Sequence, residues 1–339
     1  MSRAQNTVAV AIGDPNGIGP EIAVKAAAEL ARGDGPYALL VGDAFVIRHY
    51  AQMVAPDLPL VGSNEAGPGK LSYVAIASLP QASFIPGNVN GHAGKAMTDY
   101  LDGAMQLVRE GHAKAIVGCP HNETAVHAAG IPFSGYPGLI ARLSNVPEDS
   151  VFMMFVGGGL RIVHATLHER LATALGRLSP ELVVAAAQAA HRALQDIGIA
   201  NPRIGVFGIN PHAGENGLFG DDDDHVTTPA VAMLRERGID AEGPVGADLI
   251  ISRKDIDAFV AMYHDQGHIP IKLLAGRNAC ALSIGGGVIF SSTGHGSAFD
   301  IAGQGIADPE AALRAIRMVA GRMVADKMVA DKMVASTHT

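Results

Sequence analysis

Three histidines stand in distinctive settings along this chain, and their side chains could bind a metal ion. His168 lies in the string HATLHERL, His212 in GINPHAGENG and His264 in AMYHDQGHIP. Each follows a segment typical of a β-strand, so we expect each imidazole near the carboxyl end of a strand, where open α/β sheets build their sites. Three neutral imidazoles on one ion leave a coordination position open, as in a catalytic site, and favour Zn²⁺ or Fe²⁺ over Mg²⁺.

The residues beside these histidines support a site and leave a plainer alternative open. Asn210 and Pro211 stiffen the turn before His212, and Asp265 and Gln266 could hold an imidazole in one tautomer. A single histidine after a strand is also commonly a structural group. Sequence alone does not bring the three together.

A glycine-rich string near the C-terminus, GHGSAFDIAGQGIADP at residues 294–309, has the composition of a dinucleotide-binding loop. Its small residues allow close approach of a flat ligand, and Asp300 could accept hydrogen bonds from ribose hydroxyls. The string resembles the adenosine-binding loop of the isocitrate and isopropylmalate dehydrogenases, with Phe299 and Gln304 in place of Pro and Lys. A plain connection into a helix is the alternative. The candidate cofactor-binding residues are Gly294, His295, Gly296, Ser297, Ala298 and Asp300.

Two further strings give weaker signals. GDPNGIGPE, at residues 13–21, is a strand-to-helix turn without the G-x-G-x-x-G spacing, although helix amides there could hold an anion. The four consecutive acids at 221–224 have the composition of a metal cage, but they suit the start of a helix at 226–237 equally well.

Short β-branched runs alternate with alanine-rich helices, the pattern of a largely parallel sheet in an α/β protein. A hairpin is expected where two of the strands flank three glycines, and Pro20 and Ser179 mark two helix starts. We predict strands at residues 7–12, 38–41, 71–76, 115–118, 151–156, 160–165, 203–208 and 258–263. We predict helices at residues 21–31, 96–110, 180–197, 226–237 and 309–324.

Composition narrows the class of protein. The 339 residues suggest about two domains. With 48% hydrophobic and 17% charged residues, the chain is expected to fold around a core. A net charge of -8 argues against nucleic acid as a partner, and no apolar run approaches a membrane span. Two cysteines and no export signal predict a cytoplasmic protein. The repeated MVADK of the tail carries no evident chemistry.

Six strings place the chain in a family context. GDPNGIGPEI, AGIPFSG, NPHAGE, GPVGAD, AMYHDQGHIPIK and GHGSAFDIAG occur in this order, and together they resemble the 4-hydroxythreonine-4-phosphate dehydrogenase (PdxA) family. The resemblance implies two α/β/α domains with an interdomain cleft, as in isocitrate and isopropylmalate dehydrogenases. Residues 1–135 plus 286–339 would form the NAD-binding domain, and residues 136–285 the metal-binding and dimerisation domain.

The same resemblance assigns roles. It implies a homodimer with its active site near the subunit interface, NAD(P)-dependent oxidation, and one divalent metal on His168, His212 and His264, with one histidine from the partner subunit. Asp248 matches an acidic family position near the metal, although an ordinary loop carboxylate is the alternative. Lys272 is a candidate carboxylate clamp or proton relay, or simply a surface lysine.

Departures from the family pattern point to a substrate without phosphate. Phosphate-handling members typically carry TGHTE after AGIPF, where this chain has Tyr136 and Pro137 at the His-Thr pair. Glu123 stands at a family lysine, Phe290 at an arginine and Ala281 at an asparagine. These changes remove two cations and add a carboxylate and an aromatic ring. We therefore expect the site to bind a phosphate dianion poorly.

The altered strings GCPHNET, AGIPFSGYP, LRIVHATLHE and HDQGHIPIKLLA resemble the terephthalate cis-dihydrodiol dehydrogenase subgroup. Its members oxidise 1,2-dihydroxy-3,5-cyclohexadiene-1,4-dicarboxylate and release protocatechuate and carbon dioxide. We therefore expect a diol dicarboxylate substrate, with His121, Asn122 and Tyr136 as hydrogen-bonding groups of its pocket. NAD is the expected oxidant, with NADP as the alternative, and the metal would lower the pKa of a substrate hydroxyl.

Three other functions stay open at this point. They are 4-hydroxythreonine-4-phosphate oxidation in pyridoxal phosphate biosynthesis, oxidation of a related sugar-acid phosphate, and metal or ligand binding without turnover.

Overall fold

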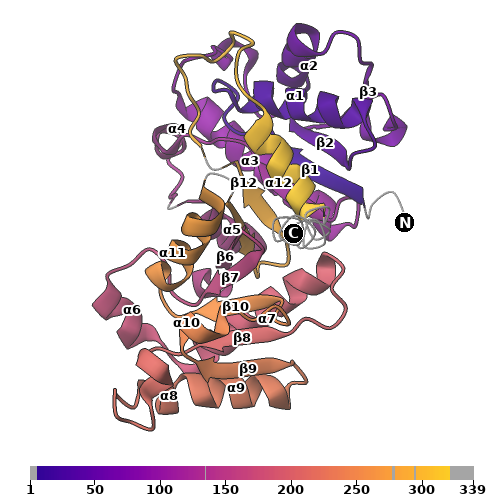
Figure 1. The fold of residues 1–339 in the computed structure, drawn as a ribbon. Coiled ribbons are helices and arrows are strands. Elements are labelled where there is room, and N and C mark those ends of the chain that lie inside the picture. The colour runs from indigo at the N-terminus through magenta and orange to yellow at the C-terminus, as the bar shows by residue number, and fades with distance from the viewer. Residues whose placement is uncertain (1–5, 134, 277–278, 294, 321–339) are drawn as a thin grey trace. The chain divides into compact units, whose positions relative to one another are not determined.

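The computed structural model describes residues 6–133, 135–276, 279–293 and 295–320, and it divides into two compact units (Figure 1). The first unit combines the chain up to Leu139 with the chain from Val288 onward, and the second is Ile140–Gly287. These boundaries lie close to the predicted domain boundaries. The roles predicted for the two domains stay predictions.

The first unit is built on a parallel sheet. Its strand order is β3-β4-β2-β1-β5-β12, and every neighbouring pair is parallel. The strands are β1 (Thr7–Ala11), β2 (Tyr37–Gly42), β3 (Leu60–Gly62), β4 (Leu71–Ala75), β5 (Ala115–Gly118) and β12 (Phe290–Ser292). The helices are α1 (Gly19–Arg32), α2 (Ala44–Val54), α3 (Gly91–Arg109), α4 (Glu123–Ala128), the start of α5 (Tyr136–Ser144) and α12 (Glu310–Val319), with short 3₁₀ turns at Ser63–Glu65 and Gln81–Ser83.

Local sequence explains these elements. Every residue of β1 is buried, as expected for a central parallel strand covered on both faces. Pro20 lies in the first turn of α1, where its missing N–H costs nothing. Asn90 caps α3 by accepting a hydrogen bond from the Ala93 N–H at 2.9 Å.

The second unit has a mixed sheet with a parallel half. Its order is β11-β6-β7-β10-β8-β9, antiparallel from β11 to β7 and parallel from β7 to β9. The strands are β6 (Phe152–Gly157), β7 (Leu160–His164), β8 (Ile204–Phe207), β9 (Ala241–Val245), β10 (Ala258–Ala261) and β11 (Cys280–Ile284). The helices are α6 (Leu171–Arg177), α7 (Pro180–Asp196), α8 (Asp222–His225), α9 (Thr227–Glu236), α10 (Ala247–Ile250) and α11 (His264–Ala275), with 3₁₀ turns at Glu148–Ser150 and Pro211–Gly214.

The prediction of a largely parallel α/β sheet is confirmed. The predicted hairpin is β6 and β7, which pair in antiparallel register around three glycines. Ser179 caps α7 as predicted, because its Oγ accepts a hydrogen bond from the Leu182 N–H at 3.2 Å. The predicted helix at 309–324 is observed as α12, and its expected end, like the MVADK repeat, lies outside the described residues.

Apolar side chains fill the interior of each unit. In the second unit Phe207 and Phe259 stack with ring centroids 5.4 Å apart, in a buried cluster that also contains Ile162 and Ile271. Among the residues described, no helix combines the length and the apolar composition needed to cross a bilayer.

Candidate functional site

The three candidate metal-binding histidines follow three neighbouring parallel strands of the second unit. His168 comes after β7, His212 after β8, and His264 opens the helix that follows β10. Because β10 pairs in parallel with both β7 and β8, the carboxyl ends of the three strands meet at one edge of the sheet. This edge is where α/β sheets commonly build their sites.

His168 and His264 lie together at this edge. Their ring centroids are 5.3 Å apart. Burial lowers the pKa of His168, and the neighbouring His264 lowers it further. The Nδ1 atom of His264 lies 2.7 Å from a carboxylate oxygen of Asp265. A hydrogen bond at Nδ1 fixes the ring orientation and leaves Nε2 to bind a metal, the partnership predicted for Asp265. Gln266, also a predicted partner, instead bonds to backbone atoms at Gly208 and Met262.

Two further imidazoles adjoin this pair. His268 stacks on His264 with ring centroids 3.7 Å apart, and its Nδ1 lies 3.0 Å from Nε2 of His164. Burial is the largest cause that lowers the pKa of His164 to about 3 and of His268 to about 4. His164 donates from Nδ1 to the Met153 carbonyl, so its Nε2 is the acceptor and His268 donates. Both rings are therefore neutral at physiological pH.

Lys272 lies on the same stripe of α11 as His264 and His268, because side chains four residues apart share a helix face. Its ammonium nitrogen stands 5.3 Å from the centroid of the Phe155 ring, in cation–π range. The side chain is a cation beside neutral imidazoles, and its charge contributes to the lowered pKa of His268.

His212 is held differently. It lies in the 3₁₀ turn Pro211–Gly214 with φ +55°, and Ala213 and Glu215 also have positive φ, at +52° and +45°. A left-handed conformation costs a non-glycine residue roughly 1–2 kcal/mol, and such residues cluster at functional sites. The His212 side chain is 63% exposed, and its Nδ1 lies 3.5 Å from a Glu215 carboxylate oxygen.

A buried carboxylate fixes the turn that carries His212. Asp223, only 1% exposed, accepts hydrogen bonds from the N–H groups of Ile209 and Asn210, at 2.8 and 3.0 Å, and from the Thr227 hydroxyl at 2.6 Å. The acidic run at 221–224 thus begins a helix, one of the two interpretations that its sequence allowed.

Asp248 lies near the His212 backbone. A side chain on Gly246 would place its Cβ 2.9 Å from an Asp248 carboxylate oxygen and 3.7 Å from the His212 nitrogen. Gly246 therefore lets the candidate acidic residue and the His212 turn approach each other.

The described residues bring two of the three histidines together. Within the described ranges, no three His, Cys, Asp or Glu side chains are grouped to hold a metal ion. His168 and His264 supply two adjacent imidazoles, a type of ligand that Zn²⁺ and Fe²⁺ accept, so the pair fits part of a divalent-metal site.

In the first unit, the candidate cofactor loop meets the candidate substrate residues. The Ser297 hydroxyl donates to the His121 carbonyl at 2.8 Å, and the Ser297 carbonyl accepts the Ile18 N–H at 2.9 Å. A Cβ on Gly17 would lie 2.8 Å from the Ser297 Cβ, so only glycine fits there. The GDPNGIGPE turn therefore supports this loop.

The remaining candidates of the loop differ in their exposure. His295, Gly296 and Asp300 are exposed, whereas Ala298 is half-buried and holds φ +38°, a strained value for a side chain. Gly294 lies outside the described residues.

An aromatic cluster includes two positions, Tyr136 and Phe290, at which the sequence departs from the family pattern. The His121 ring lies 4.5 Å from Tyr136 and 4.8 Å from Phe133, and Tyr136 lies 4.5 Å from Phe290, measured between ring centroids. The cluster lies beside the carboxyl end of β5, because Phe290, at the start of β12, and Tyr136, at the start of α5, both pack against Gly118. They form a largely buried aromatic cluster, in which Phe290 is 1% and Tyr136 7% exposed, and the His121 side chain is the more exposed member at 23%.

Two candidate substrate residues use their polar groups locally. The Tyr136 hydroxyl donates to the Cys119 carbonyl at 2.7 Å, and Asn122 Oδ1 caps α4 by accepting the Ala125 N–H at 2.8 Å. Burial raises the pKa of Tyr136, which keeps its hydroxyl protonated. The Tyr136 hydroxyl is therefore engaged within the protein.

Sequence reasoning missed Asp14, which follows β1 in the GDPNG turn. Its side chain is completely buried, Oδ1 accepts the Asn16 N–H at 2.9 Å, and no partner for Oδ2 occurs in the described part of the chain. Burial raises the pKa of Asp14 to about 6. An acid in a glycine-rich turn directly after a buried strand was the available signal.

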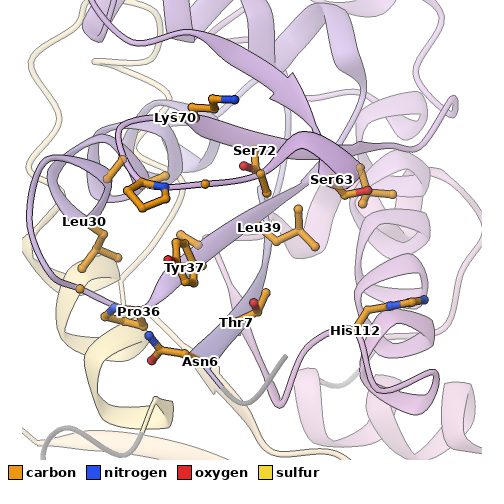
Figure 2. A pocket seen from close by; sticks show the side chains of 18 of the residues that line it. Asn6, Thr7, Leu30, Pro36, Tyr37, Leu39, Ser63, Lys70, Ser72 and His112 are labelled. Atoms are coloured by element: carbon orange, nitrogen blue, oxygen red, sulfur yellow. The ribbon is translucent and has the colours of Figure 1, made fainter. Parts of the chain in front are cut away.

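A cavity of about 750 Å³ lies elsewhere in the first unit. Figure 2 shows Thr7, at the start of β1, beside Tyr37, at the start of β2, with Lys70 and His112 farther along its wall. This cavity lies at the amino ends of the strands and contains none of the candidate site residues. Since α/β sheets place their sites at the carboxyl ends, we do not assign the reaction to it.

Comparison with known proteins shows which family the chain matches. Residues 36–319 match the family described as pyridoxal phosphate biosynthetic protein PdxA. The chain is 46% identical to the 1,2-dihydroxy-3,5-cyclohexadiene-1,4-dicarboxylate dehydrogenase of a Comamonas species, over 94% of this chain and 98% of the relative. It is 40% identical to the D-threonate 4-phosphate dehydrogenase of Cupriavidus necator, with the same coverage. The structure of a terephthalate 1,2-cis-dihydrodiol dehydrogenase from Burkholderia xenovorans is 54% identical, with a TM-score of 0.81, covering 93% of this chain and 97% of the other.

Proposed function

This chain belongs to the PdxA family of dehydrogenases, and we propose that it oxidises terephthalate cis-dihydrodiol with NAD to give protocatechuate and carbon dioxide. The proposal includes a divalent metal and a homodimer. The predicted cleft between two domains, as in isocitrate and isopropylmalate dehydrogenases, stays part of the same proposal.

The aromatic cluster of His121, Phe133, Tyr136 and Phe290 carries this proposal. A phosphate dianion needs cations or several N–H donors around it. Here the Tyr136 ring is wedged between His121 and Phe290, and its hydroxyl is already bonded to Cys119. A six-membered diene ring is therefore a better ligand for a site beside this aromatic cluster than a phosphate ester.

We place the metal on His168 and His264 of one subunit and His212 of the partner subunit. The first two rings are adjacent, and Asp265 engages the ring of His264. His212 is exposed on a strained turn, as expected for a ligand that reaches outward to a second copy. A bound metal would supply Lewis-acid polarisation of a substrate hydroxyl.

Exposed apolar side chains near these histidines support the homodimer. Leu218 and Phe219, which follow the His212 turn, are 72% and 47% exposed, and Leu273 on α11 is 80% exposed. Leu249, next to Asp248, is 60% exposed. Large apolar side chains around a polar centre are typical of a protein interface.

The chain's own groups have defined tasks in this proposal. Asp265 holds the ring of His264 so that one nitrogen faces outward, and Lys272 binds a substrate carboxylate. Oxidation of the hydroxyl carbon next to the carboxylate-bearing carbon gives a β-keto acid. Its decarboxylation restores an aromatic ring, which makes the sequence irreversible. Asp248 would accept or relay a proton near His212.

NAD is the proposed oxidant because Asp300 is an exposed carboxylate in the cofactor loop. A carboxylate can accept hydrogen bonds from both ribose hydroxyls, whereas it repels the 2′-phosphate of NADP. We expect Asp300→Ser to narrow the preference for NAD over NADP by about tenfold.

The test of the reaction is its stoichiometry. Incubation of the metal-loaded protein with NAD and terephthalate cis-dihydrodiol should yield NADH, protocatechuate and carbon dioxide in equal amounts. Turnover of D-threonate 4-phosphate or 4-phosphohydroxy-L-threonine, with no reaction of the diol, would replace this proposal with a phosphate-ester dehydrogenase.

The shared metal site has its own test. His212→Ala and His264→Ala homodimers should both be inactive. Random mixing of the two should restore about a quarter of wild-type activity, because half of the dimers are mixed and each mixed dimer keeps one complete site. Mixtures that stay inactive, while exchange of subunits is demonstrated, would place all three ligands within one chain.

A further inference from the structure

The segment from Ser297 to Ala307, which contains most of the candidate cofactor loop, is anchored at both ends to the start of the chain. Its first anchor is the bond between the Ile18 N–H and the Ser297 carbonyl, at 2.9 Å. Its second anchor is a pair of side chains on α1, Glu21 and Lys25, which lie more than two hundred residues earlier in the sequence.

Glu21 receives the amides of the second anchor. Its Oε1 accepts the Ala307 N–H at 2.7 Å, and its Oε2 accepts the Gly305 N–H at 3.1 Å. The side chain is completely buried. A buried carboxylate needs such donors, and hydrogen bonds to a charged acceptor are among the strong ones.

Lys25 completes the same anchor from the other side. Its Nζ donates to the carbonyls of Gly305 and Ala307, at 2.8 and 2.7 Å, and to Glu21 Oε1 at 2.8 Å. The pair therefore binds both the N–H and the C=O of two loop residues.

The stretch between the two anchors is partly exposed to solvent. Asp300 is exposed, and Ala298 holds the strained φ of +38°. Fixing both ends removes conformational freedom that a ligand would otherwise have to freeze, so a preformed loop binds its ligand more tightly.

We propose that Glu21 and Lys25 are positioning residues that set the affinity for the dinucleotide by fixing the segment from Ser297 to Ala307, without touching the dinucleotide themselves. This inference rests on the proposed NAD-linked function. It assigns a role to the GDPNGIGPE turn and its helix, which the sequence left as a weak anion-site candidate.

The direct test is Lys25→Met, which keeps the length of the side chain and removes its three hydrogen bonds. The matched control is Lys95→Met, which also removes an i,i+4 ion pair, between Lys95 and Asp99 on α3, but contacts no part of the loop. We expect the Kd for NADH, measured by its fluorescence, to rise by about tenfold for Lys25→Met and to stay within about twofold for the control.

Two further readouts separate positioning from general damage. Hydrogen exchange of the peptide covering residues 300–309 should quicken in Lys25→Met while peptides of the second unit stay unchanged. At saturating NAD, kcat and metal content should match the wild type, so that the defect lies in KM for NAD. Glu21→Gln, which keeps one acceptor oxygen, should give a smaller shift in the same direction.

The outcomes distinguish a failure of the proposed function from a failure of this inference alone. Wild-type protein that binds neither NAD nor NADP would overturn the proposed function and this inference with it. Wild-type binding of NADH, with equal Kd and equal exchange at residues 300–309 in Lys25→Met and Glu21→Gln, would overturn this inference alone. Equal losses in Lys25→Met and Lys95→Met would also overturn it.

Discussion

The two units hold their candidate residues in opposite ways. In the first, backbone groups of the cofactor segment bond to buried or half-buried side chains of the same chain, as Gly305 and Ala307 do with Glu21 and Lys25. In the second, His212 stands 63% exposed on a strained turn, with a single carboxylate beside it.

This difference indicates which part of the proposed site a single chain can form without a second copy. In the first unit, hydrogen bonds within the chain fix the conformation of the segment from Ser297 to Ala307, so this segment needs no ligand to be ordered. The second unit fixes the backbone of the His212 turn through buried Asp223 but leaves the imidazole pointing to solvent. In the proposed function, this exposed imidazole at a strained position is the ligand that a second copy would use.

The largest expected effect comes from removing that imidazole. His212→Ala should abolish metal binding and lower kcat by about 1000-fold or more, since in the proposed reaction the metal would activate the substrate hydroxyl. The fold should stay intact because the side chain is exposed. Metal content by mass spectrometry, circular dichroism and turnover measure these effects, with His225→Ala as the exposed control. Full metal content in His212→Ala would remove His212 from the ligands.

The next effect tests the turn beneath His212. Asp223→Ala leaves two backbone N–H groups and the Thr227 hydroxyl without their acceptor. Losing a buried charged acceptor should lower the free energy of unfolding by roughly 3 kcal/mol. Urea denaturation measures it, and Asp224→Ala, at an exposed position, should cost under about 0.5 kcal/mol. Equal costs would deny that Asp223 supports the turn.

A third prediction concerns the buried carboxyl group of Asp14 in the first unit. Burial raises the pKa of Asp14 to about 6, above its value of 3.8 in an unfolded chain. Its contribution to stability is therefore complete below pH 3.8 and is lost as the pH rises through 6. The two neighbours that sense its charge, Tyr100 and Tyr136, stay protonated in this range.

Asp14→Asn removes this titration. Relative to the wild type, the variant should gain up to roughly 3 kcal/mol of unfolding free energy between pH 4 and pH 7.5, from about two pKa units at 1.36 kcal/mol each. Urea denaturation at the two pH values measures it. A difference between variant and wild type that does not change with pH would mean that Asp14 is ionised in the folded protein at both.

The smallest effect concerns Tyr136. Tyr136→Phe loses one hydrogen bond to Cys119, worth about 1 kcal/mol of stability, and keeps the ring that faces His121. We expect kcat/KM for the diol to stay within about threefold of the wild type. A loss as large as that of His212→Ala would instead give the hydroxyl a part in the chemistry.

Sequence patterns predicted the helices and strands whose signals are local, such as an apolar run or an N-cap residue. Strand β1 and the β6–β7 hairpin are runs of apolar residues between glycines, and α7 carries its cap in Ser179. Helix α11 was not predicted, because Gly267 and Pro270 interrupt its helical pattern. Strands as short as β12 give too few residues for an alternating pattern to be recognised.

The candidate site shows the same limit. The sequence placed each of the three histidines after a strand. Those strands are neighbours, and His168 and His264 adjoin. That all three bind one metal ion stays a prediction. The roles of Asp14 and of the Glu21–Lys25 pair were missed, because burial and contacts with residues 305–307 are long-range properties. No spacing rule reveals a partner that lies so far along the chain.

The most direct measurement is the ratio of kcat/KM for terephthalate cis-dihydrodiol to that for 4-phosphohydroxy-L-threonine, measured with the same metal-loaded enzyme and NAD. The proposed substrate site beside the aromatic cluster of His121, Tyr136 and Phe290 predicts a ratio of at least about 1000, because a phosphate dianion placed there would lack its cations. A ratio below one would contradict the account.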